Sequence, residues 1–168
     1  MYQLNEVILY DTEGLCKITE IASRNFGGGD TDFYILTPIN KKGMTIYVPV
    51  NNKKQTDRMC RVLCPEEIYE LIENVPEEKW IEDKNERKIR YKKIIHSGNR
   101  KDIIKLFKTL YIHREEQARK GRHLHLVDEQ VFKNAEKILY EEFSHVLHIS
   151  KEDVGPFILK HIKVKEKL

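Results

Sequence analysis

The single tryptophan of the chain, Trp80, lies where an acidic segment meets the most basic one. Residues 65–78 hold six Glu and no Lys or Arg, whereas residues 79–122 hold 15 Lys and Arg against six Asp and Glu. A local excess of positive charge attracts polyanions such as nucleic acid. Because an indole ring can also stack on an unpaired base, a tryptophan beside a basic segment could contact both bases and phosphates.

Spacing alone leaves two interpretations of Trp80 open. If a helix ran unbroken over residues 77–96, Trp80 would share one face with Arg87, Tyr91 and Ile94 and could be an ordinary core residue. Alternatively, the ring is exposed for interaction, and its basic neighbours are unusual company for a core anchor. Charge runs are also common on solvated helices that bind nothing, so the basic segment does not decide between the two by itself.

No segment matches a catalytic or metal-binding motif. The three glycines at residues 27–29 lack the Lys and Ser/Thr ending of a phosphate-binding loop and precede a predicted strand, which favours a hairpin turn. The HLH segment at residues 123–125, His113 and the CRVLC segment at residues 60–64 lack the spacing of a four-ligand zinc site. We therefore expect no catalytic residue, no metal and no cofactor; a metal-dependent hydrolase is an alternative that metal analysis would test.

The first 64 residues are typical of a small β domain. Turn-forming segments separate runs of β-branched and aromatic residues at positions 7–10, 15–21, 32–36 and 44–50. Four or five strands in about 64 residues favour a small, strongly bent antiparallel barrel over a sandwich of about seven strands. Pro49 cannot donate to a sheet ladder, so the segment before it is expected to lie at a sheet edge that another protein could dock on.

From Pro65 onward the hydrophobic period becomes helical. The pattern predicts helices over residues 66–74 and 100–121, and a third over 127–147 that begins at an Asp128 cap. Ser150, with Asp153 three residues later, indicates a capping box that opens a further short helix. The chain is therefore expected to form two domains, β then α: residues 1–64 and a compact helical bundle over residues 65–168.

Length and composition set the broad class. A chain of 168 residues suits one ordinary domain or two small ones. No run of about 18 apolar residues could span a bilayer, and the N-terminal MYQLNEVILYD lacks the basic start and apolar stretch of a secretory signal. Three cysteines are an odd number and form no disulfide framework. We expect a cytoplasmic protein with reduced thiols and no membrane partner.

The order of several motifs resembles that of the CarD/CdnL family of bacterial transcription regulators. The likeness runs from about residue 3 to residue 147, and its motifs are YDTEGLCKITEI, FYIL, MTIYVPV, a lone Trp, RYKKIIHSG and AEKILYEEF. It implies a Tudor/SH3-like barrel in residues 1–64 that binds the β subunit of RNA polymerase, and a helical domain in residues 65–168 that contacts promoter DNA. The implied mechanism places a tryptophan at the upstream edge of the bubble, where it slows collapse of the melted promoter.

The resemblance also implies roles for individual residues. Trp80 matches the wedge that meets a distorted base step from the minor groove, and its basic neighbours would hold phosphates without reading sequence. The expected DNA-binding residues are Trp80, Lys84, Arg87, Lys88, Arg90, Lys92 and Lys93. The expected polymerase-binding residues are Arg24, Ile46, Tyr47, Val48 and Pro49. Tyr47 stands where many family members carry arginine, so the chemistry of that contact departs from the family pattern.

The expected partners are thus RNA polymerase and promoter DNA, with no small-molecule substrate. The alternative is a protein-interaction adaptor whose basic face is solvated surface and touches no DNA. Binding to promoter DNA in the presence of polymerase would separate the two.

Overall fold

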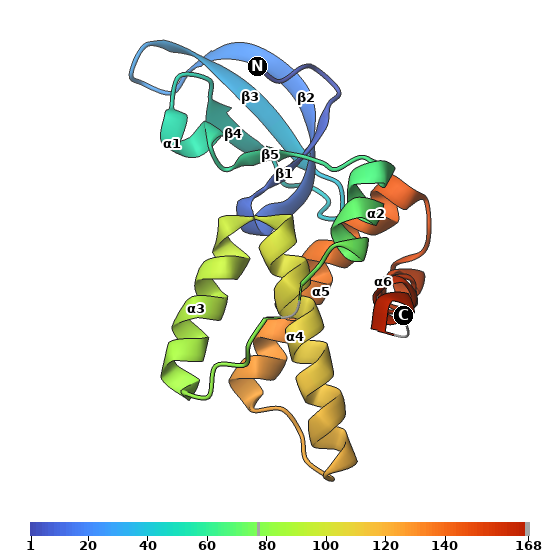
Figure 1. Cartoon of the computed structure of the whole chain (residues 1–168). Coiled ribbons are helices and arrows are strands. Elements are labelled where there is room, and N and C mark those ends of the chain that lie inside the picture. Colours follow the sequence, from blue (N-terminus) through green and yellow to red (C-terminus); the bar gives the residue numbers. More distant parts are fainter. Residues whose placement is uncertain (77, 167–168) are drawn as a thin grey trace. The chain divides into compact units, whose positions relative to one another are not determined.

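A computed structural model gives the fold and describes residues 1–76 and 78–166. The chain divides into two compact units, a sheet unit of Met1–Val62 and a helical unit of Leu63–Leu168 (Figure 1). The order of strands first and helices second confirms the predicted fold class. Across the part of the chain that is described, no helix combines the length and the apolar character needed to cross a membrane.

The sheet unit contains five antiparallel strands in the order β4-β3-β2-β1-β5. They are β1 (Val7–Tyr10), β2 (Gly14–Asn25), β3 (Asp30–Pro38), β4 (Ile46–Pro49) and β5 (Met59–Arg61). Two short helical turns, η1 (Asp11–Glu13) and α1 (Lys53–Thr56), connect them. The first four strands lie where the sequence predicts strands. β5 was not predicted as a separate strand, because three residues are too few to show an alternating pattern.

β2 and β3 form a long hairpin that bends (Figure 1). The register shifts between Ile18 and Glu20, and such a bulge bends the strand and increases its twist. At the other end of the hairpin, Gly27 and Gly29 have φ angles of +98° and +96°, which side chains other than glycine rarely adopt. The glycine run is therefore a hairpin turn, as predicted.

One face of the sheet forms the core of the sheet unit. Strand residues alternate between the two faces, so every second side chain points into the core. The core side chains are Ile8, Tyr10, Cys16, Ile18, Tyr34, Leu36, Val48 and Met59. The opposite face of β2, β3 and β4 carries buried side chains such as Ile35 and Phe33 as well as exposed ones such as Arg24 and Tyr47.

The described residues of the helical unit form five helices. They are α2 (Pro65–Glu73), α3 (Lys84–Ser97), α4 (Arg100–Arg119), α5 (Leu126–Leu147) and α6 (Lys151–Glu166). α4 packs on α5, α5 on α6, and α3 on both α4 and α5. The largest fully buried side chains of their shared core are Tyr91, Phe107, Phe132, Phe143, Ile68, Ile72, Ile103 and Ile104.

The helix boundaries differ from prediction at two places. α5 begins at Leu126 with His125 as its N-cap, so the prediction of Asp128 as the cap is wrong; the Asp128 side chain is buried and binds Arg87 instead. α6 begins directly after Ser150, as predicted, but the Ser150 hydroxyl donates to the Asp153 carboxylate at 2.8 Å, which is a side-chain bond and not the backbone pairing of a capping box. α6 is nevertheless a helix of 16 residues and not a short one.

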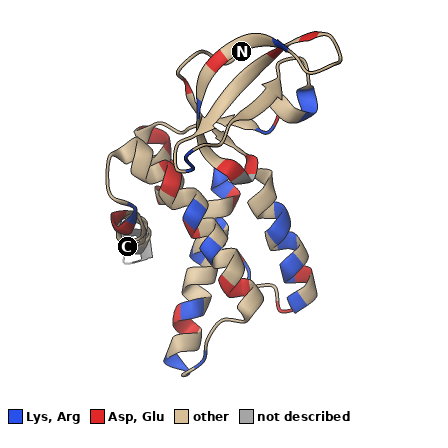
Figure 2. Cartoon of the chain, turned by 180° about the vertical axis from the view of Figure 1, so that it is seen from behind, with Lys and Arg blue, Asp and Glu red and all other residues tan. Residues whose placement is uncertain are grey.

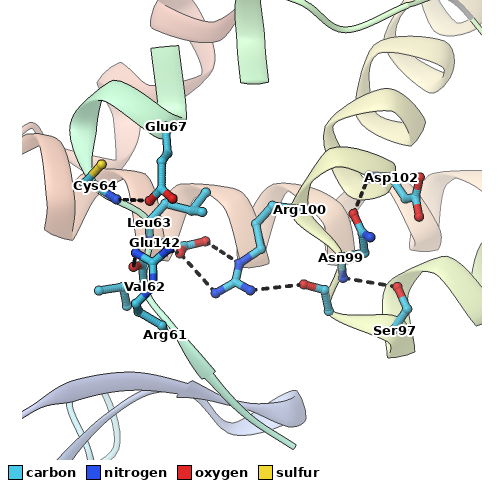
Figure 3. A network of polar contacts seen from close by, with 11 residues as sticks. Arg61, Val62, Leu63, Cys64, Glu67, Ser97, Asn99, Arg100, Asp102 and Glu142 are labelled. Carbon is cyan, nitrogen blue, oxygen red and sulfur yellow. Dashed lines mark hydrogen bonds and ion pairs between the residues drawn. The ribbon is translucent and has the colours of Figure 1, made fainter. Parts of the chain in front are cut away.

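A buried carboxylate holds the beginning of the helical unit in place (Figure 3). Glu142 on α5 is fully buried and accepts the backbone N–H of Leu63 at 2.9 Å. Its two carboxylate oxygens also accept from the guanidinium of Arg100, at the start of α4, at 3.1 and 3.2 Å. Glu142 therefore ties the first residue of the unit to the ends of two core helices.

Candidate nucleic-acid and polymerase interfaces

Trp80 lies in a non-helical segment that precedes α3. α3 begins only at Lys84, because the side chain of Asp83 accepts the backbone N–H of Glu86 at 2.8 Å and caps the helix there. The helix considered over residues 77–96 therefore does not extend over residues 78–83. Residue 77 lies outside the described residues. Trp80 is half-buried and packs at the border of the helical core.

Three side chains contact the indole ring. The ring of His113 on α4 stacks on it, with centroids 3.6 Å apart and an interplanar angle of 13°. The guanidinium carbon of Arg87 lies 4.5 Å from its centroid, a cation–π contact, and Tyr91 meets it edge-on at 6.4 Å. The ring therefore packs on its own unit, as the core interpretation predicts, and keeps part of its surface in solvent; its role as an interaction residue stays a prediction.

Arg87 is a structural residue. Its guanidinium donates two hydrogen bonds to Asp128 on α5, at 2.9 and 2.7 Å, and only 2% of the residue is exposed. The expectation that Arg87 contacts DNA phosphate is therefore corrected, because its donors are occupied and withdrawn from solvent. The hydrogen bonds with Asp128 raise the pKa of Arg87, so its guanidinium remains charged.

The same guanidinium fixes the segment that carries Trp80. Arg87 Nη1 donates to the backbone carbonyl of Ile81 at 2.9 Å and to that of Glu82 at 3.3 Å. With the cation–π contact, these bonds hold the residues on the C-terminal side of Trp80 against α3. Arg87 therefore positions the indole while Asp128 holds Arg87.

The other predicted phosphate-binding residues are exposed on α3. Lys84, Lys88, Lys92 and Lys93 all have exposed side chains, and Figure 2 shows basic residues along this helix. Arg90 is exposed as well and pairs with Glu78 at 2.7 Å. An exposed ion pair contributes little stability, so a phosphate could compete with Glu78 for Arg90. The structure thus keeps four lysines and one arginine of the predicted set accessible.

Trp80 and His113 together line two pockets. One, of about 160 Å³, is also lined by Glu78, Lys108 and Glu116. The other, of about 340 Å³, is lined mainly by basic and imidazole side chains from α3, the end of α4 and the α4–α5 connection. Burial lowers the pKa of His113, so its ring is neutral over a wider pH range than an exposed imidazole.

The predicted polymerase-binding strand lies at a sheet edge. β4 pairs with β3 on one side and stands at the end of the strand order, and Pro49 is its last residue. Tyr47 is exposed, whereas Ile46 and Pro49 are half-buried. The expectation for Val48 needs a correction, because its side chain is fully buried in the core and only its backbone can take part in docking.

Arg24 and Tyr47 share the outer face of the sheet. Arg24 is opposite Thr31 in the β2–β3 register, and Tyr47 is opposite Ile35 in the β3–β4 register. Thr31 and Ile35 are separated by an even number of residues along β3, so the two partners point to the same face. Arg24 is exposed and pairs with Glu20 at 2.5 Å.

An aromatic cluster covers part of this outer face. Phe26, Phe33 and Tyr47 meet edge to face, with centroid separations from 5.3 to 6.1 Å. Phe33 is buried beneath the other two rings, while 68% of Phe26 and 44% of Tyr47 are exposed. Exposed aromatic rings around a packed one are common in protein interfaces. The surface around Tyr47 is therefore apolar and aromatic, in place of the arginine of the family pattern.

Three parts of the candidate sites were missed by sequence reasoning. Phe26 was not singled out, although an aromatic residue directly before a glycine turn cannot be part of the sheet core. His113 was considered only as a metal ligand, and its stacking on Trp80 depends on the packing of α4. The residues of the α4–α5 connection were treated as surface. Within the described residues, no three His, Cys, Asp or Glu side chains come together as a metal site.

Comparison with known proteins addresses the sheet unit. No curated protein matches the chain at a significant level. A family model, described as the CarD-like/TRCF RID domain, matches residues 2–62. These residues correspond to the sheet unit, with its five strands and its aromatic outer face. The sheet unit therefore belongs to the CarD-like family of RNA polymerase-interacting domains, and the chain is a transcription-related protein with RNA polymerase as its partner.

Proposed function

We propose that the protein regulates transcription by stabilising the open complex of RNA polymerase at promoters in the bacterial cytoplasm. The sheet unit binds the β subunit of the polymerase, and the helical unit presents Trp80 to the upstream edge of the melted DNA. The observation that carries the proposal is a half-exposed tryptophan, fixed by Arg87 beside a lysine-rich helix, in a chain whose other unit is a polymerase-interacting domain. We propose no catalytic step.

The energy available from one indole is sufficient for this role. Opening of a base pair costs stacking energy, and an aromatic side chain that stacks on an unpaired base returns about 1–3 kcal/mol. Because about 1.4 kcal/mol corresponds to a factor of ten in an equilibrium, one contact can shift the open-complex population about tenfold. A ring already fixed against its own unit loses little conformational freedom on binding, which favours the contact.

The lysines of α3 provide the contact with the DNA backbone. Lys84, Lys88, Lys92 and Lys93 are exposed on the helix that follows Trp80, so phosphates on either side of a bound base lie within reach of long flexible cations. Such contacts fix position and do not read sequence, and promoter choice would come from the polymerase. Arg87 contributes by placing Trp80.

Polymerase binding is proposed through the edge strand and the outer face next to it. β4 offers unpaired backbone groups for the addition of a strand, and Phe26 and Tyr47 offer apolar anchors beside them. Arg24 lies on the same face and can exchange its exposed pairing with Glu20 for a carboxylate of the polymerase.

The proposal is tested by the lifetime of open complexes after a competitor is added. Trp80→Ala should shorten the lifetime about tenfold while binding to polymerase is unchanged. Trp80→Phe should restore part of it, because a smaller aromatic ring still stacks. Tyr69→Ala is the matched control, since Tyr69 is a partly exposed aromatic residue elsewhere in the helical unit. Equal lifetimes for wild type and Trp80→Ala would contradict the proposal.

The adaptor alternative, in which the protein touches no DNA, predicts a different response to charge reversal. Under the proposal, Lys88→Glu, Lys92→Glu and Lys93→Glu together weaken association with promoter DNA, and most strongly at low salt. Lys133→Glu, Lys137→Glu and Lys151→Glu, which are equally exposed and make the same change in net charge, serve as the control. An adaptor would respond to neither set.

A further inference from the structure

The larger pocket beside Trp80 has the composition of a site for a phosphate-bearing ligand. It measures about 340 Å³, and three separate segments meet there: the end of the Trp80 segment with α3, the last turns of α4, and the α4–α5 connection. Lys84, Gln117, Arg122, His123 and His125 supply side-chain N–H donors around it. We refer to this pocket as the α4–α5 pocket.

The charge of the α4–α5 pocket favours an anion. Glu82 is the single acidic residue among its described lining residues, against Lys84 and Arg122, which are both exposed. Arg87 also lines the pocket, and its charge is balanced by Asp128. A positive balance remains after this pairing, before any charge on the histidines is considered. Arg and Lys donors bind phosphate oxygens more strongly than neutral donors do.

The aromatic wall of the pocket narrows the ligand class further. Trp80 and His113 both line it as a stacked pair, so a base can contact the part of the indole that His113 and Arg87 leave exposed while its phosphate reaches the cations. A volume of about 340 Å³ is at the lower end of the roughly 300–1,000 Å³ of small-ligand pockets, which suits one nucleotide and excludes a duplex. The combination fits an unpaired nucleotide.

We propose that the α4–α5 pocket binds the phosphate of a single unpaired nucleotide of the melted strand, with Arg122 and His123 as its principal phosphate contacts and the base against Trp80. This inference rests on the proposed contact of Trp80 with DNA. It adds a second contact, specific for a single strand, that the α4–α5 connection provides. Lys88, Lys92 and Lys93 of α3 hold the backbone by charge alone, whereas the α4–α5 pocket, which Lys84 also lines, accepts a nucleotide only after the duplex has opened.

The test compares single-stranded with double-stranded oligonucleotides, and the fluorescence of the single tryptophan reports binding. Wild type should prefer a single-stranded oligonucleotide, and Arg122→Glu should reduce that affinity about tenfold because it reverses a phosphate contact. Lys160→Glu is the matched control, because it makes the same charge change at an exposed position on α6. The control should change the affinity less than about twofold.

Folding of the variants is not in question, because the Arg122 side chain is exposed and the turn around it is made by the backbone. The N–H of Arg122 donates to the carbonyl of Gln117, and Gly121 takes the positive φ. His123→Ala with His125→Ala is the second variant and should also weaken single-strand binding. Equal losses for Arg122→Glu and Lys160→Glu would overturn the proposal, since they would indicate a general charge effect.

Two further measurements complete the test. The first distinguishes a free nucleotide from a DNA strand as the ligand, and the second distinguishes failure of the pocket proposal from failure of the proposed function. A free deoxynucleoside monophosphate that competes with the oligonucleotide supports the pocket as a nucleotide site, and the ratio of the two affinities shows whether the strand or the free nucleotide is preferred. A monophosphate that fails to compete even at saturating concentration overturns it. If Arg122→Glu leaves open-complex lifetime and single-strand affinity unchanged while Trp80→Ala shortens the lifetime, the pocket proposal fails and the proposed function stands.

Discussion

Each unit of the protein has an arginine in its candidate site, and the two arginines have opposite environments. In the sheet unit, Arg24 is exposed, pairs with Glu20 on its own strand and lies on the same outer face as Tyr47. In the helical unit, Arg87 is buried, pairs with Asp128 on another helix and holds the segment that carries Trp80. Arg24 lies on the surface proposed to bind polymerase. Arg87 is part of the internal structure that positions Trp80.

This difference follows from the elements that carry the two sites. A sheet places alternate residues on one face whatever their neighbours are, so its outer face is defined by register alone. Trp80 lies on a segment without helix or strand, and such a segment needs contacts from elsewhere to hold a shape. The outer face of the sheet should therefore tolerate single substitutions, whereas the site around Trp80 should depend on a few buried bonds.

The strongest test of this contrast is Arg87→Ala. Removal of one partner from a buried ion pair leaves Asp128 uncompensated, which typically costs about 3–5 kcal/mol of unfolding free energy. Urea unfolding of the helical unit measures the loss, and the fluorescence of Trp80 in the folded protein shows whether the indole becomes more exposed. Lys88→Ala, the next residue on the same helix but exposed, should change stability by less than about 0.5 kcal/mol.

Replacement of both partners separates the effect of the uncompensated Asp128 charge from the effect of lost packing. Arg87→Met with Asp128→Leu removes the ion pair without an orphaned charge, so it should cost much less than Arg87→Ala alone. The double variant still lacks the bonds to Ile81 and Glu82, so the tryptophan should be displaced although the unit is stable. A double variant as unstable as the single one would mean that the charge balance is not the cause.

A second buried carboxylate tests whether the dependence on internal bonds extends beyond Trp80. Glu142→Gln keeps the shape of the side chain but weakens its bonds to Arg100 and Leu63, and charged hydrogen bonds contribute about 1.5–3 kcal/mol each. We expect a loss of unfolding free energy in that range, smaller than for Arg87→Ala because Arg100 is partly exposed. Glu152→Gln, at an exposed position on α6, is the control and should change the unfolding free energy by less than about 0.5 kcal/mol.

Substitutions on the outer face of the sheet should affect binding and not folding. Phe26→Ala with Tyr47→Ala removes two rings that stay 68% and 44% exposed in the folded protein, so little burial is lost with them. Affinity for RNA polymerase should fall about tenfold, because anchors of an interface commonly cost 1–2 kcal/mol when truncated. Ile39→Ala, an exposed apolar residue just beyond β3, is the control. A change in unfolding free energy larger than the change in binding would break the contrast between the two units.

The sequence predicts the sheet unit better than the site around Trp80, for reasons that specific residues show. The strands, the glycine turn and the edge position of β4 depend on local alternation and turn chemistry, and the same alternation would have placed Tyr47 outward and Val48 inward. Arg87 shares a helix face with Tyr91, which is a local sign of burial, but its partner Asp128 is 41 positions away in the sequence. No local period relates the two residues, so the charge run of α3 was interpreted as uniformly exposed.

His113 offers the smallest test, through the pH dependence of the Trp80 site. Burial lowers the pKa of His113, with Arg87 acting in the same direction and Glu116, Asp128 and Glu82 opposing it. The unfolded chain therefore takes up a proton before the folded one as pH falls, so His113 contributes stability that is present above its ordinary pKa and is lost as pH decreases through that range. His113→Phe keeps an aromatic ring on Trp80 and does not titrate, so between pH 7.5 and 5 its urea midpoint should fall less than that of wild type. Other groups titrate equally in both proteins, and the difference between them isolates His113. The same decrease in both would contradict the prediction, because it would show that protonation of His113 does not affect the stability of the fold.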